Sequence, residues 1–132
     1  MYVERINARV SATSLGNFCT FAELTGLENA KNVVLTTTMW DMFGHTDAAS
    51  KWEQRWRDDP WNDMIDNGAA VERLPFNNSD STWSIVDKIV NKSHQKPVLL
   101  FQQEMVDRRK PLEATCAGKA LRQKLDRATM QV

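Results

Sequence analysis

The sequence predicts an α/β protein with a three-stranded parallel sheet flanked by helices and a C-terminal helical tail. The first indication is the run of apolar residues Val33–Leu35, which is typical of a strand that is covered on both faces. Two further segments, Tyr2–Ile6 and Ala69–Leu74, also have strand-like composition. Helical patterns separate the three runs, and this alternation favours parallel strands joined by right-handed crossovers.

The first helix is predicted between the first two strands. Ser11, Thr13 and Ser14 are candidate N-caps, and Gly26 stands where a C-terminal cap is expected. The apolar face of this helix carries Leu15, Phe18, Phe21, Ala22 and Leu24. Cys19 falls on the same side, so we expect its thiol to be buried.

The second strand is predicted over Asn32–Thr38, and a long helix is expected from about Ala48 to Asp66. Pro60 lies inside that helix and should break or kink it near Asp59. The apolar positions of the helix include Trp52, Trp56 and Trp61, whose spacing favours core packing over an aromatic binding surface.

After the third strand, a helix is predicted from Ser81 to about Lys92, and the tail begins at Pro97. The helix is expected to bury Trp83, Ile85, Val86, Ile89 and Val90. The tail should form two helical pieces, interrupted at Lys110-Pro111.

Composition excludes several classes of function. The chain has 132 residues, of which 42% are apolar, and its 17 basic and 17 acidic residues cancel. A neutral chain has no electrostatic basis for binding nucleic acid or an anionic membrane, and no apolar run is long enough to span a bilayer. Cys19 and Cys116 fit no metal or redox spacing and are expected to be reduced thiols, so a cytoplasmic location is predicted.

The most informative motif is Thr36–Asp41, where the second strand runs into a polar loop that ends on an acid. Ligands of open parallel sheets bind beyond the carboxyl ends of the strands. The guanine-reading motif of GTPases at this place is Asn-Lys-x-Asp, and here Thr38, Met39, Trp40 and Asp41 occupy its four positions. The carboxylate of Asp41 could accept from the two N–H donors of guanine, or it could only cap a turn.

The chain from Tyr2 to about Met105 resembles the second half of the P-loop GTPase (G) domains of mushroom-forming fungi, distant relatives of the septin and immunity-associated GTPases. The resemblance rests on segments in the order of that family: Tyr2–Ile6, Thr13–Leu15, Lys31–Asp41, Trp83–Val86 and Gln103–Asp107. It implies that residues 1–96 are a partial G domain, the base-recognition half, and that residues 97–132 are a helical extension.

This resemblance implies binding of GTP or GDP, which is expected to be weak or absent in this chain by itself, with Mg²⁺ only in a complete family member. The loop with Asn77 and Asn78 would bring backbone N–H groups toward the guanine carbonyl, although it could equally be a plain turn with a helix cap. No G-x-x-x-x-G-K-[ST] phosphate loop and no magnesium-holding acid motif is present. We therefore assign no catalytic residue and expect no GTP hydrolysis by this chain alone.

A non-catalytic interaction module is the alternative. The tail carries an amphipathic stripe that could dock a partner helix or pack on its own sheet, formed by Leu112, Leu121, Leu125 and Ala128. The resemblance also implies that Tyr2–Ile6 forms an exposed sheet edge, through which the chain could self-associate. In a half-domain, the helix with Phe18 and Phe21 should lose part of its cover.

Overall fold

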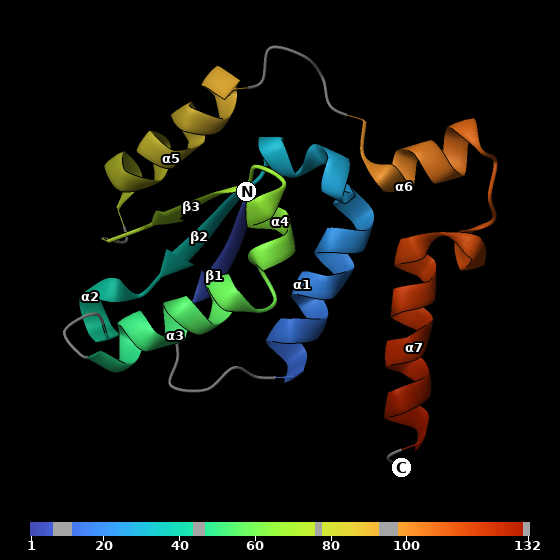
Figure 1. The fold of residues 1–132 in the computed structure, drawn as a ribbon, viewed down its shortest axis with the longest axis horizontal. Helices are drawn as coiled ribbons and strands as arrows, with labels where there is room; N and C mark the ends of the chain where they lie inside the picture. The colour runs from blue at the N-terminus through green and yellow to red at the C-terminus, as the bar shows by residue number, and fades with distance from the viewer. Residues whose placement is uncertain (7–11, 44–46, 76–77, 93–97, 131–132) are drawn as a thin grey trace.

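The computed structural model describes residues 1–6, 12–43, 47–75, 78–92 and 98–130. Its three strands, β1 (Tyr2–Arg5), β2 (Val34–Thr38) and β3 (Ala70–Arg73), form a parallel sheet in the order β1-β2-β3 (Figure 1). Helices flank the sheet, and the chain ends in a C-terminal helix. The predicted fold class is therefore confirmed.

The strand register decides which side chains share a face of the sheet. Tyr2 lies opposite Leu35, and Leu35 lies opposite Val71, so this row points to one face. Two residues further along, Thr37 lies between Glu4 and Arg73 on that same face.

β1 is an edge strand of the described sheet. The Ile6 N–H donates to the Thr38 carbonyl at 3.1 Å. Because backbone polar groups alternate in direction along a strand, those of Val3 and Arg5 point away from β2. The prediction that the first strand forms an edge is thus confirmed.

Proline and glycine set the ends of the helices as predicted. The long helix is divided into α3 and α4 around Pro60, and Gly26 has a positive φ of 82° while its N–H donates to Ala22 at 2.9 Å. The elements before the tail are α1 (Ala12–Thr25), the 3₁₀ turn η1 (Leu27–Asn32), α2 (Trp40–Phe43), α3 (Asp47–Asp58), α4 (Asn62–Asp66) and α5 (Ser79–Lys92).

Helices α1, α3 and α4 lie along one face of the sheet (Figure 1). Aromatic side chains build much of the core there. Trp56 is fully buried, with ring centroids 5.5 Å from Trp52 and 5.4 Å from Trp61. Phe18 packs edge-on against Trp56, with 6.4 Å between the ring centroids. Core packing of these three tryptophans is confirmed, and such pairs contribute about 0.5–1.5 kcal/mol each beyond their buried area.

Two expectations for α1 were wrong. Phe18 is buried and Phe21 is half-buried against Tyr2, so the helix keeps its cover even though β1 is an edge. The tail adds cover, because α7 packs along α1. Cys19 is exposed, because the face of α1 that contacts the core is formed by Leu15, Phe18, Phe21 and Ala22.

α5 packs on the opposite face of the sheet, where Ile85 is buried and Lys88 pairs with Glu72 of β3 at 2.9 Å. The predicted burial of Trp83 and Val90 is wrong, because both side chains are 63% exposed. These two residues are seven positions apart and share one helix face, whereas the single face that α5 turns to the sheet is occupied by Ile85 and its helical neighbours.

The tail comprises α6 (Leu100–Gln102), the π-helical turn η2 (Gln103–Asp107), the 3₁₀ turn η3 (Leu112–Ala114) and α7 (Cys116–Met130). The long helix α7 lies beside α1 (Figure 1). Small residues allow this approach: Ala117 is buried, and the Lys124 side chain crosses Gly16, where a Cβ would clash with it. Lys124 Nζ then donates to Asn17 Oδ1 at 3.3 Å.

A buried carboxylate ties the tail together. Both oxygens of Glu104 accept the Cys116 N–H at the start of α7, at 3.1 and 3.2 Å, and Oε2 also accepts from Lys110 Nζ at 3.2 Å. Burial acts to raise the pKa of Glu104, but these hydrogen bonds and the Lys110 charge outweigh it, so the pKa lies below its ordinary value. The thiol of Cys116 has a raised pKa, because it is partly withdrawn from water and lies next to the Glu104 charge.

Candidate functional site

The loop at the carboxyl end of β2 carries three of the predicted base-site residues. Thr38 is the last residue of the strand, and its Oγ1 lies 3.5 Å from the Glu4 carbonyl, to which it donates. Met39 adopts a left-handed conformation with φ 70° and packs partly against the core. This turn redirects the chain, so that Trp40 and Asp41 open the short helix α2.

Trp40 is held from two sides. Its Nε1 donates to Thr37 Oγ1 at 2.8 Å, and the guanidinium of Arg73 lies over its ring, 4.0 Å from the centroid. The indole therefore has a fixed position at the end of the sheet, directly before Asp41.

Glu53 of α3 holds the two residues that contact Trp40, namely Thr37 and Arg73. Its carboxylate, which is 5% exposed, accepts from Arg73 Nε and Nη2 at 3.0 Å each and from Thr37 Oγ1 at 3.2 Å. Arg57, one turn further along α3, lies 3.5 Å away. The two-pronged Arg73 contact is the geometry that gives charge-assisted pairs their strength. We name the group Glu53, Arg73, Thr37 and Trp40 the Glu53 network.

Sequence reasoning missed Glu53 and Arg73, although one signal was present. The buried positions of α3 are Ala49, Trp52, Glu53 and Trp56, which follow the helical spacing of one face. An acid on such a face needs a buried partner. The partner could not be identified without the strand register that sets Arg73 beside Thr37.

Asp41 is exposed and has no side-chain partner within the described ranges. Asn78 does have a partner: its Oδ1 accepts the Ser81 N–H at 2.9 Å, which makes it the cap at the start of α5. Asn77 lies outside the described residues. The neighbouring strands β2 and β3 end at the same side of the sheet (Figure 1), where the Leu74 N–H donates to the Thr37 carbonyl at 2.8 Å. Asp41 follows the end of β2 in the sequence, and Asn78 follows the end of β3.

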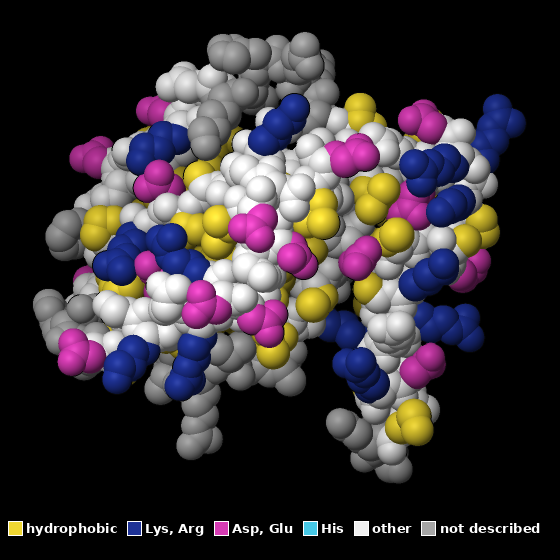
Figure 2. Space-filling view, in the orientation of Figure 1, with side chains coloured by type: hydrophobic (Ala, Val, Ile, Leu, Met, Phe, Trp, Pro, Cys, Tyr) yellow, Lys and Arg dark blue, Asp and Glu magenta, His cyan; other side chains and the backbone are white. Residues whose placement is uncertain are grey.

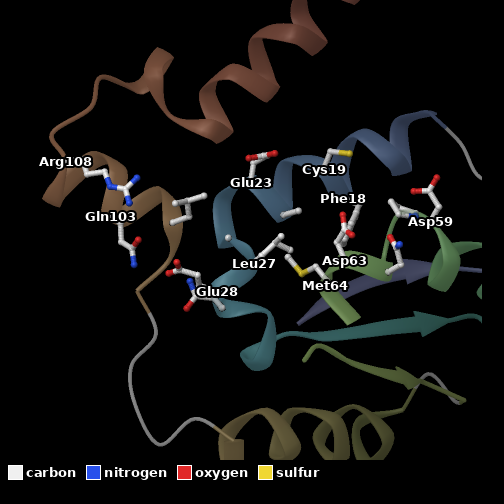
Figure 3. Close-up of a pocket in the computed structure, with 16 residues that line it drawn as sticks. Phe18, Cys19, Glu23, Leu27, Glu28, Asp59, Asp63, Met64, Gln103 and Arg108 are labelled. Atoms are coloured by element: carbon white, nitrogen blue, oxygen red, sulfur yellow. The ribbon is translucent and has the colours of Figure 1, made fainter. Parts of the chain in front are cut away.

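A cavity of about 580 Å³ opens elsewhere, between α1, the Gly26–Asn29 turn, the segment Asp59–Met64 and the start of the tail (Figure 3). None of the predicted site residues that the structure describes lines it. The base site expected from the sequence and this cavity are therefore separate places on the molecule.

Comparisons with models of protein families, with curated proteins and with solved structures find no match. Among the residues that the structure describes, no helix has the length and apolar character needed to cross a membrane. Within the same ranges, no three His, Cys, Asp or Glu side chains converge to hold a metal ion. Basic and acidic side chains are mixed over the face shown in Figure 2.

Proposed function

We propose that this chain is the base-recognition half of a P-loop GTPase-like domain, which binds guanine nucleotides through Asp41 and does not hydrolyse them alone. The observation that supports the proposal best is the presentation of Asp41. Its carboxylate is exposed at the end of the central strand, directly after an indole that the Glu53 network holds in place. An exposed acceptor next to a well-packed scaffold is what recognition of a planar donor pair requires.

The chemistry of Asp41 favours guanine over adenine. A carboxylate accepts two hydrogen bonds in one plane, and guanine offers its N1–H and exocyclic amine there, whereas adenine offers no such pair. Thr38 and Met39 complete the proposed base site, with the thioether of Met39 as an apolar contact for the base. Mg²⁺ belongs to the proposal only for a complete domain, because this sequence has no phosphate loop. A cytoplasmic location is part of the same proposal.

Titration with GDP and ADP, followed by intrinsic tryptophan fluorescence, tests the proposal. GDP should bind more tightly than ADP, and Asp41→Asn should weaken GDP about tenfold, because an unmet hydrogen bond costs about 1–3 kcal/mol. Asp66→Asn, an exposed acid at the end of α4, is the matched control and should leave GDP binding unchanged. Equal affinity for GDP and ADP, absence of GDP binding, or GTP turnover that Asp41→Asn abolishes would each contradict the proposal.

The second candidate is a non-catalytic interaction module. The observation that favours it is the unburied stripe of α7, where Leu121 and Leu125 are one turn apart and 50% and 61% exposed. The contact that α7 makes with α1 involves Lys124, which crosses Gly16 and bonds to Asn17, whereas the two leucines stay exposed. Under this proposal the leucines contact a partner helix, and the sheet serves only as a scaffold.

A further inference from the structure

We propose that the cavity beside α1 binds a linear aliphatic polyamine. The cavity is separate from Asp41, so this inference does not depend on the proposed nucleotide site. Its volume of about 580 Å³ lies within the range of about 300–1,000 Å³ that is typical of small-molecule sites.

The floor of the cavity is apolar and continuous with the hydrophobic core. Phe18 and Met64 are both nearly fully buried and belong to the hydrophobic core, while Ala22, Leu27 and Leu100 add aliphatic surface around them. Methylene segments of a ligand would be removed from water on this floor. The site thus suits a ligand with an aliphatic body.

The charged side chains around this floor are mostly acidic. Four carboxylates line the cavity, against the one guanidinium of Arg108: Glu23, Glu28, Asp59 and Asp63. None of these five side chains forms an ion pair in the described part of the chain. Among the described residues that line the cavity, four negative charges and one positive charge leave a formal charge of −3, although the whole chain is neutral. The complementary occupant is a cation with several charges.

A polyamine fits this arrangement better than a metal ion. Figure 3 shows the acidic side chains spread along the cavity from Glu28 to Asp59, so they do not converge on one point. The absence of a metal-type cluster in the described ranges agrees with this spread. A chain with ammonium groups separated by methylenes can donate to successive carboxylates while its aliphatic segments cover the floor.

Calorimetric titration of the full chain with spermidine tests the inference, with 1,8-octanediol as a neutral ligand of similar length. Spermidine should bind and the diol should not. Glu23→Gln combined with Asp63→Asn should weaken spermidine about tenfold, because each exposed pair contributes about two- to fivefold. The control pair Glu113→Gln and Asp126→Asn removes the same charge from exposed sites outside the cavity and should leave the affinity unchanged.

Arg108→Gln provides a test in the opposite direction. It removes an exposed guanidinium, the single basic group among the described lining residues, and spermidine should then bind about two- to fivefold more tightly. Equal loss of affinity in the cavity and control pairs would show general counterion attraction and overturn the inference. Binding of the diol as tightly as spermidine, no spermidine binding, or unchanged affinity in Arg108→Gln would overturn it as well.

Discussion

The coupling between Glu53 and Arg73 is the sharpest test of how the end of the sheet is held. The Glu53 side chain is 5% exposed and that of Arg73 is 51% exposed, with Nε and Nη2 each 3.0 Å from the carboxylate. Charge-assisted hydrogen bonds contribute about 1.5–3 kcal/mol when buried. Because half of the Arg73 side chain remains in water, we expect a coupling free energy of about 1–2 kcal/mol.

A double-mutant cycle with Glu53→Ala, Arg73→Ala and the double variant measures this coupling by urea unfolding. The pair Lys88–Glu72 is the matched control, with a similar distance of 2.9 Å but side chains 52% and 29% exposed. Its coupling should be about 0.2–1 kcal/mol, as for other surface pairs. A Glu53–Arg73 coupling no larger than that of the control would refute the conclusion that this pair holds the end of the sheet.

Two further predictions concern the tail and the sheet edge. The pKa of Glu104 lies below its ordinary value of 4.5, so the stability that it contributes is fully present above that pH and is lost as the pH falls through the lower, folded value. Urea unfolding below about pH 5 should show this loss as a fall in the free energy of unfolding with falling pH. Glu104→Gln should make that fall shallower, and an unchanged dependence on pH would contradict the lowered pKa of Glu104. Analytical ultracentrifugation should detect self-association through β1, which Val3→Lys should weaken by placing a charge on the edge strand. If Leu121→Ser with Leu125→Ser abolishes association and Val3→Lys does not, the edge is not the interface and the stripe of α7 is.

Sequence patterns predicted the elements whose signals are local. The consecutive apolar residues of the central strand, the break at Pro60 and the positive φ of Gly26 each follow from the chemistry of a few neighbouring residues. The burial of Trp52 and Trp56 follows from helical periodicity in the same way. Such features need no knowledge of the partner element.

Features that depend on distant partners could not be predicted. Arg73 reaches Glu53 only because β3 pairs in the register that sets it beside Thr37. The exposure of Trp83 depends on which face α5 turns to a narrow sheet, and periodicity cannot choose between faces of similar apolarity. For the candidate site, the sequence led to the hypothesis about Asp41. It hinted at the Glu53 network only through an acid on the apolar face of α3, and it did not indicate the cavity beside α1.

The packing of the indoles divides the tryptophans into two optical populations. Trp40, Trp52, Trp56 and Trp61 are buried, and the last three have indole N–H groups without an acceptor in the described residues. Dry indoles emit at shorter wavelength than hydrated ones and are shielded from dissolved quenchers. The exposed Trp83 should supply the long-wavelength component of the emission. A soluble quencher should therefore reduce the fluorescence of Trp83 in α5 and leave the emission of the buried tryptophans largely unchanged.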